Sequence, residues 1–159
     1  MKAKHHFWSS LAAGGALYWA TGSGAALAGT MVGGFLIDAD HIIDQLWSIS
    51  HGAPYRKPIA QDHPKSFPPF KRVLNLLRPR KLVRLPIVFH SYELLALIAV
   101  ATFVLRTHFL IGLLTGYVLH LTLDLVRHHN EFRSPLFYLL SYRLRWGFRR
   151  DQLIKSEYL

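Results

Sequence analysis

The most constraining feature of this sequence is the length of its uncharged stretches. Residues 7–37 contain no Asp, Glu, Lys or Arg over 31 positions, and residues 94–105 and 107–123 form two further runs separated by Arg106. A helix that crosses a bilayer needs ~20 predominantly apolar residues. These runs exclude an intrinsically disordered chain, which is poor in apolar residues, and they favour helices that lie in or on a membrane.

Turn signals divide the uncharged stretches into helices. The sequence Thr21-Gly22-Ser23-Gly24 marks a turn, so we predict helices over residues 8–20 and 25–44, with Ser9 or Ser10 as the first N-cap. In the second half, helices are expected over residues 88–105 and 109–128. Small residues are dense in the first pair of helices and would allow close approach of helices in a membrane.

The charge between the apolar halves is strongly basic. The chain has 19 Lys and Arg against nine acids, a net charge of +10, and residues 52–86 hold nine basic residues and one acid. Seven of the eight prolines lie in that segment, which predicts a loop. Residues 71–77 are expected to form a short amphipathic helix on a membrane surface or, alternatively, part of a solvated loop. The basic, aromatic residues 142–150 are interpreted as a topology-setting anchor or a headgroup contact.

We therefore predict an all-α protein with one helical domain over residues 1–159. It is expected to be an up-down four-helix membrane-associated bundle with a basic Pro-rich middle loop and a basic C-terminal tail. The predicted parts are an apolar hairpin, a basic loop, a second hairpin and a tail: 7–44, 45–87, 88–129 and 130–159. A soluble, very apolar bundle is the alternative. A secretory signal is a second alternative, but the apolar pattern continues past its expected cleavage site, so we expect this segment to be retained.

Up-down connectivity brings the polar residues of all four helices to one end. The residues concerned are His5, His6, Asp38, Asp40, His41, Asp44, His90, Glu93, His120, Asp124, His128 and His129. Most basic residues fall at the same end, so the positive-inside rule predicts an inner (cytoplasmic) membrane protein with this end in the cytoplasm. Expected partners are membrane lipids and anionic headgroups. We expect no nucleic-acid partner, because no nucleic-acid motif is present.

An isolated carboxylate in an apolar helix is costly unless it is paired or bound to a cation. His120 and Asp124 are four residues apart on one helical face; this pair alone would fit a simple hydrogen bond or ion pair. The convergence of many such residues instead predicts a divalent metal site, with Zn²⁺ favoured and Mn²⁺ or Fe²⁺ as alternatives. The chain has no cysteine, which excludes thiolate ligands. The predicted ligands are His5, His6, Asp38, His41, His90, His120, Asp124 and His128.

Three segments carry a family resemblance: Leu-Ile-Asp-Ala-Asp-His at 36–41, His-Ser at 90–91, and Gly-Tyr-Val-Leu-His-Leu-Thr-Leu-Asp at 116–124. In order and spacing they resemble the membrane-bound metal-dependent hydrolases, a family distantly similar to the zinc-dependent phospholipase C and nuclease superfamily. The resemblance implies that Asp38, His90, His120 and Asp124 bind metal, with His5 or His6 as the N-terminal ligand. Asp40 and His41 would complete the acidic motif.

The resemblance implies a hydrolase that attacks a phosphoester, such as a phospholipid or lipid-linked phosphate, with metal-activated water. Two or more ions would be bridged by Asp124 or Asp38, and Asp40 would act as general base or orient a ligand histidine. The chain departs from the family at Ile37, where the family has Pro, and at Phe89, where the family has Thr. The His-Arg-Gly that usually precedes the family's Thr-His-Ser is also missing. These departures favour the alternative of a non-enzymatic membrane protein with a structural metal or polar cluster. A haem-binding bundle is a third hypothesis, which the clustered carboxylates oppose.

Overall fold

The computed structural model describes residues 3–41, 85 and 87–158, and these residues form helices and turns with no strand. The helices are α1 (Ala3–Thr21), α2 (Gly24–Gly34), α5 (Tyr92–Leu105), α6 (His108–His128), α7 (Leu140–Arg145) and α8 (Arg150–Leu153). Short 3₁₀ turns cover Leu36–Asp38, Pro135–Tyr138 and Ser156–Tyr158. The all-α prediction is therefore confirmed for the described residues, whereas the expected helix over residues 71–77 lies outside them.

The first helical pair turns at the predicted position. Gly22 adopts a left-handed φ of 64°, which glycine accepts without steric cost, and Ser23 precedes α2 in an extended conformation. The prediction that Ser9 or Ser10 caps α1 is wrong, because α1 already begins at Ala3. Both hydroxyls instead donate to the carbonyl of His6, at 3.1 Å and 2.6 Å.

Helix α2 is shorter than predicted. It ends at Gly34, and the chain continues through Phe35 into a 3₁₀ turn rather than running as one helix towards residue 44. Two consecutive glycines provide little propensity to extend a helix. The end of α2 also leaves the Gly34 carbonyl without an intrahelical partner, and this oxygen accepts a hydrogen bond from His120. Residues 42–44 of the predicted helix lie outside the described residues.

The second helical pair is bounded by side-chain caps. Ser91 Oγ accepts from the amide of Leu94 at 3.3 Å, so α5 begins at Tyr92 and not at residue 88 as predicted. Arg106 ends α5 in a left-handed conformation, with φ 50°. Thr107 Oγ1 then caps α6 by accepting from the amide of Leu110 at 3.3 Å, and α6 matches its prediction within one residue.

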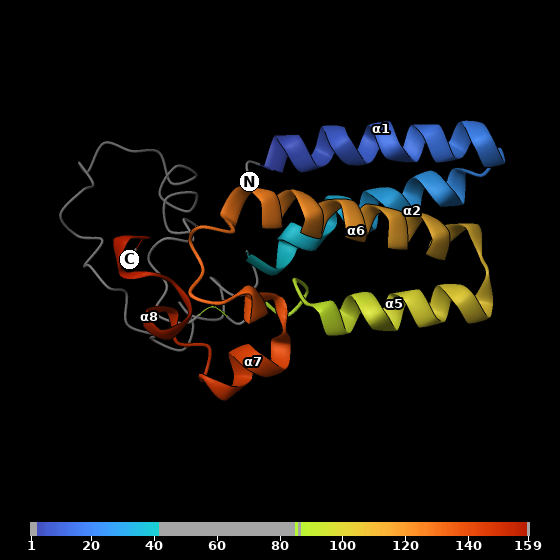
Figure 1. Ribbon diagram of the computed structural model, residues 1–159. Coiled ribbons are helices and arrows are strands. Elements are labelled where there is room, and N and C mark those ends of the chain that lie inside the picture. Colours follow the sequence, from blue (N-terminus) through green and yellow to red (C-terminus); the bar gives the residue numbers. More distant parts are fainter. Residues whose placement is uncertain (1–2, 42–84, 86, 159) are drawn as a thin grey trace, which may run out of the picture.

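Helices α2 and α6 pack with their backbones in contact. A Cβ atom added at Gly112 would lie 2.0 Å from the carbonyl oxygen of Ala26, and one added at Gly33 would lie 2.2 Å from that of Leu113. Larger side chains at these positions would force the helices apart. In Figure 1, α1, α2, α5 and α6 run alongside one another, and the start of α1, the end of α2, the start of α5 and the end of α6 lie at the same end.

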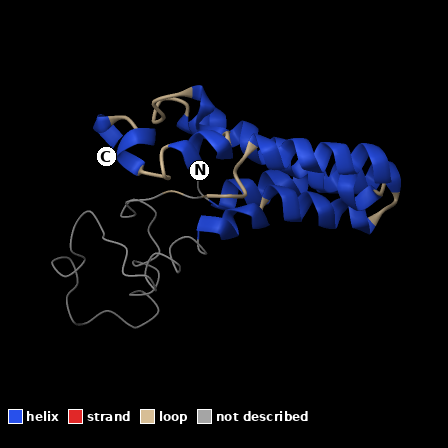
Figure 2. Cartoon of the chain, turned by 90° about the horizontal axis from the view of Figure 1, so that it is seen from below, coloured by secondary structure: helices blue, strands red, loops and turns tan. Residues whose placement is uncertain are grey.

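The C-terminal segment folds back onto that end, which Figure 2 shows from a second direction. Glu93 caps α7, because its carboxylate accepts from the amides of Leu140 at 2.8 Å and Ser141 at 2.9 Å. Phe137, Tyr138 and Leu153 are buried in the same apolar core as Ile37 and Leu121. Residues of the segment predicted as a basic tail are therefore packed against the helix ends.

Among the described residues, one helix has the length and apolarity needed to cross a membrane. It is α6, with 21 residues and a mean hydropathy of 1.8 over its best window. Helix α5 is also apolar but has only 14 residues.

Candidate metal centre

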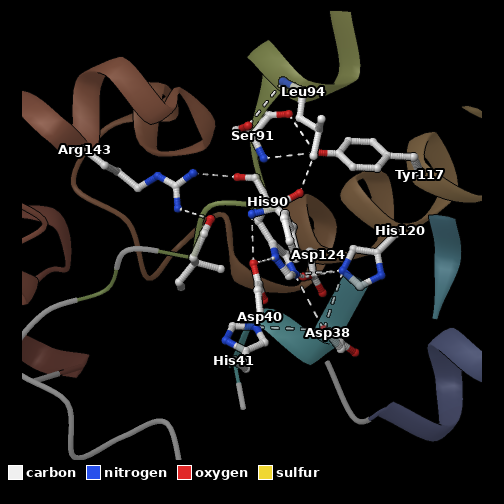
Figure 3. A network of polar contacts seen from close by, with 12 residues as sticks. Asp38, Asp40, His41, His90, Ser91, Leu94, Tyr117, His120, Asp124 and Arg143 are labelled. Atoms are coloured by element: carbon white, nitrogen blue, oxygen red, sulfur yellow. Dashed lines mark hydrogen bonds and ion pairs between the residues drawn. The ribbon is translucent and has the colours of Figure 1, made fainter. Parts of the chain in front are cut away.

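Side chains from distant parts of the sequence converge where the helix ends meet (Figure 3). Helix α1 contributes His6, and the segment after α2 contributes Asp38, Asp40 and His41. The turn before α5 contributes His90, and α6 contributes His120 and Asp124. The largest sequence separation between two residues in contact is that of His6 and Asp124, which are 118 positions apart. The convergence predicted from connectivity is therefore present.

Four donor atoms form the centre of the cluster. The Nε2 atoms of His90 and His120 lie 2.9 Å apart. Oδ1 of Asp38 lies 3.6 Å from the first and 3.7 Å from the second, and Oδ2 of Asp124 lies 3.6 Å and 3.5 Å from them. Zn–N and Zn–O bonds of about 2.0–2.1 Å in a tetrahedron place neighbouring ligand atoms about 3.3 Å apart. The five observed distances, 2.9–3.7 Å, lie around this spacing, so these atoms are close enough to bind a shared ion.

The other ring nitrogens of these two histidines fix where their lone pairs point. His120 Nδ1 lies 2.8 Å from the Gly34 carbonyl, which can only accept, so this nitrogen is the donor. His90 Nδ1 lies 2.9 Å from Asp40 Oδ2 and donates to that carboxylate in the same way. In the neutral rings both Nε2 atoms are then acceptors. Two lone pairs that face each other at 2.9 Å require a cation between them, either a proton or a metal ion.

Without a metal, the required cation is a proton on His90. Burial disfavours the imidazolium form, but hydrogen bonds to Asp38 and Asp40 and the charge of Asp124 outweigh it and raise the pKa of His90 to about 9. Burial also opposes ionisation of Asp38, yet its contact with His90 and the neighbouring histidines lower the pKa of that carboxyl. A divalent ion would take the place of this proton, and the negative charges of Asp38 and Asp124 would balance its charge.

Asp40 is hydrogen-bonded to the ring of His90 and is buried behind it. Its Oδ2 accepts from both His90 Nδ1 and the amide of Phe89, at 2.9 Å and 3.0 Å, and the residue is 3% exposed. A carboxylate on the far nitrogen of a ligand histidine fixes its tautomer and ring orientation. Of the two roles predicted for Asp40, general base and orienting partner, the observed contacts correspond to the second.

His6 is the N-terminal histidine that reaches the cluster. It is completely buried, its Nε2 lies 3.1 Å from Asp124 Oδ1, and its ring stacks on His120 with centroids 4.1 Å apart. His5 is exposed and belongs to none of the donor groups found among the described residues. Successive residues of a helix point about 100° apart, so only one of the two histidines can face inwards, and His5 needs to be removed from the predicted ligands.

The remaining two predicted ligands differ in their surroundings. His41 Nε2 lies 3.9 Å from Asp38 Oδ1 and forms a donor group with Asp38 and His90; burial and the charge of His90 lower its pKa. His128 instead pairs with Glu131, with Nδ1 and Oε1 2.8 Å apart, and lies outside the donor groups of the described residues. One helical turn beyond Asp124, its side chain reaches towards the C-terminal segment, so the prediction for His128 is not supported.

Two residues that sequence reasoning missed support the turn that carries His90 (Figure 3). Arg143 is fully buried, and its Nη1 and Nη2 donate to the carbonyls of Ile87 at 2.7 Å and His90 at 2.8 Å. The Tyr117 hydroxyl lies 2.5 Å from the Phe89 carbonyl and 2.9 Å from that of Ser91. Arg143 lies in a basic run that resembles a membrane anchor, so its neighbours in the sequence give no signal of this role.

A cavity of about 630 Å³ opens beside the cluster. Asp38, His41, His90 and Asp124 form one part of its wall. The rest comes mainly from apolar side chains of the chain after α2 and of the C-terminal segment, including Leu36, Phe137 and Tyr138. Ligand pockets typically measure ~300–1,000 Å³ and combine apolar walls with a few polar groups, and this cavity fits that description.

The chain matches no family model, no curated protein and no solved structure.

Proposed function

We propose that this protein is a membrane-bound metal-dependent hydrolase that acts on a phosphoester, such as a phospholipid or lipid-linked phosphate. The observation that carries the proposal is the approach of His90 Nε2 and His120 Nε2 to 2.9 Å, while the other ring nitrogens contact Asp40 and the Gly34 carbonyl. The oxygens of Asp38 and Asp124 complete the set. Two imidazoles and two carboxylates without thiolate suit Zn²⁺ best, with Mn²⁺ or Fe²⁺ as alternatives.

The cluster holds more donors than one tetrahedral ion takes. Three overlapping donor groups together comprise six residues: His6, Asp38, His41, His90, His120 and Asp124. Asp124 directs Oδ1 to His6 and Oδ2 to His90 and His120, and Asp38 belongs to two of the groups. These contacts support a site for two ions, with Asp124 or Asp38 as the bridging carboxylate.

A bound metal of this kind lowers the pKa of a coordinated water to about 7 and so supplies hydroxide at neutral pH. The protein's own contribution is to fix the ligands and admit the substrate. Asp40 orients the His90 ring, and the Gly34 carbonyl orients that of His120. The cavity reaches Asp38, His90 and Asp124, which gives a substrate direct access to the ligands and favours an enzyme.

The alternative is a structural metal in a membrane protein without enzymatic activity. One specific observation favours it: Asp38 Oδ1 and Asp124 Oδ2 both lie within 3.7 Å of the Nε2 atoms of His90 and His120. A single ion held by all four would have no open position for water. The two functions differ in whether metal-loaded protein hydrolyses a phosphoester.

Membrane association is proposed from α6 and from the exposed apolar side chains around it. Helix α5 exposes Leu97, Val100, Phe103 and Val104 by 62–74%, an arrangement that is costly in water and favourable in lipid. Trp8 and Trp19 of α1 are 65% and 90% exposed, and tryptophan favours the membrane–water interface. We infer a four-helix membrane bundle in the inner membrane, with the cluster at the cytoplasmic side because most basic residues belong, in the sequence, to the segments that flank the helices at that end.

The first test is the metal content of the purified protein. Wild type is expected to contain stoichiometric metal, whereas His120→Ala and Asp124→Ala are expected to lose most of it. His108→Ala, at the opposite end of α6, is the matched control and should retain it. Wild type without metal would overturn both the enzyme and the structural-metal proposals.

A second measurement separates those two. Chromogenic phosphodiesters and phospholipids are offered to the metal-loaded protein in lipid. Turnover that is lost in Asp124→Ala and retained in His108→Ala supports the hydrolase. Stoichiometric metal without turnover on any of these substrates would favour the structural role.

A further inference from the structure

The cavity beside the cluster has an apolar neighbour. This second cavity, of about 210 Å³, lies among α2, α5 and α6, and Leu36 lines both. Consecutive residues line different cavities at two places. Ile37 and Phe89 line the smaller cavity, whereas the residues that follow them, Asp38 and His90, line the larger one. The two cavities therefore adjoin along Leu36 and these two short segments.

The polarity changes sharply from one cavity to the other. The smaller cavity is lined by aliphatic side chains, including Val32, Leu94, Ile98 and Leu113. Among the described residues that line it, the one polar side chain is that of Tyr117, whose hydroxyl is already hydrogen-bonded to the backbone of the His90 turn. A ligand group in this cavity gains no hydrogen bond from such a wall, so the wall selects hydrocarbon.

The charges of the larger cavity favour an anion once a metal is bound. A divalent ion balances the two carboxylates of Asp38 and Asp124, and Glu131 is paired with His128. Metal ions of this kind bind phosphoryl oxygens, so a phosphate-like group can be held at the metal centre. Without the metal, the carboxylates would repel such a group.

We propose that the two adjoining cavities bind one amphiphile, with its phosphate-like group at the metal centre and its hydrocarbon chain over Leu36 among α2, α5 and α6. This inference rests on the proposed function, because the anion needs the metal. The chain would come from a lipid in the surrounding bilayer. Leu36 and Phe89, which line the smaller cavity, are 53% and 41% exposed, so the apolar end lies at the surface.

Alkylphosphonates test the proposal, because they present a phosphate-like head on a chain and cannot be hydrolysed as esters. Methyl-, butyl- and octylphosphonate are titrated by calorimetry into metal-loaded protein in phosphatidylcholine nanodiscs, with empty nanodiscs as the blank. Affinity is expected to increase by a factor of about 2–4 for each methylene that enters the apolar cavity. Equal affinity for the three compounds, with metal bound, would overturn the proposal.

A matched pair of variants locates the apolar end of the ligand. Leu94→Phe fills the apolar cavity and should weaken octylphosphonate at least tenfold while sparing methylphosphonate. Leu97→Phe, on the exposed face of α5, should change neither. Equal effects of the two substitutions on octylphosphonate would contradict the proposed binding mode.

The metal titration that precedes these measurements distinguishes failure of the proposed function from failure of the amphiphile site. If the protein binds no metal, the proposed function fails first and the amphiphile site fails with it. If metal binds but Leu94→Phe leaves octylphosphonate affinity unchanged, the amphiphile site is wrong and the metal centre stands.

Discussion

His90 and His120 approach each other through nitrogens that cannot both be hydrogen-bond acceptors at 2.9 Å without a cation between them. Their opposite ring nitrogens are held by Asp40 and by the Gly34 carbonyl. This arrangement combines the turn before α5, the middle of α6 and the C-terminal end of α2. The premature end of α2 is part of the site, since a continuous helix would have used the Gly34 carbonyl internally.

Metal binding is expected to release a proton from His90. The pKa of His90 is raised to about 9 in the metal-free protein, so its imidazolium predominates at neutral pH, and a metal can bind Nε2 only after that proton leaves. Affinity should therefore increase by up to about tenfold per pH unit between pH 7 and 9 and level off above. Calorimetry in buffers of different ionisation enthalpy measures the released proton. No release at pH 7 would show that His90 is not a ligand.

The same pKa has the opposite consequence for the metal-free fold. Because the pKa of His90 is raised above its ordinary value of 6.5, its contribution to stability is fully present below pH 6.5 and is lost as the pH rises through 9. The melting temperature of metal-free protein should fall over that interval. Saturating Zn²⁺ should reduce or reverse the decline, since metal replaces the proton. A metal-free melting temperature that rises between pH 6.5 and 9 would contradict the assigned protonation.

Asp40→Asn is expected to weaken metal binding about 10–100-fold, the usual effect of losing a carboxylate that orients a ligand histidine. Glu131→Gln is the matched control, because Glu131 contacts His128 outside the donor groups, and it should leave the affinity unchanged. Metal affinity is measured by competition with a chromogenic chelator. If Asp40→Asn kept its affinity and lost only turnover, Asp40 would be the general base instead.

The sequence predicts the parts of the centre that follow from helical spacing and connectivity. His120 and Asp124 share a helical face, and antiparallel pairs of helices bring Asp38, His90 and His6 to the same end. It does not predict which of His5 and His6 faces inwards, because that depends on the rotation of α1 against α2 and α6. It also misses where α2 ends, since the bond from His120 to Gly34 joins residues 86 positions apart.

The support of the His90 turn by Arg143 is likewise set by tertiary packing, and it gives a stability prediction. Arg143→Met leaves the carbonyls of Ile87 and His90 without these donors. Loss of two buried hydrogen bonds from a charged donor is expected to lower the free energy of unfolding by about 2–5 kcal/mol and to weaken metal binding. Arg145→Met, an exposed arginine of the same helix, should stay within ~0.5 kcal/mol of wild type. Equal free energies of unfolding for the two variants, measured by chemical denaturation, would show that Arg143 does not stabilise the turn.

The contact between α2 and α6 predicts that substitution by alanine has different effects on stability at two glycines. Gly112→Ala places a methyl group 2.0 Å from the Ala26 carbonyl oxygen, so the two backbones must separate, at a cost of about 1–3 kcal/mol. Because His120 lies on α6 and bonds to α2 at Gly34, the separation should also lengthen that bond and weaken metal binding. Gly15→Ala is the control: nothing lies within 4 Å of the added atom, and alanine favours the helix by up to about 1 kcal/mol. Thermal unfolding in detergent should place Gly112→Ala below wild type and Gly15→Ala at or above it. If Gly112→Ala were as stable as wild type and bound metal as tightly, the close approach of these helices would not be needed for the metal centre.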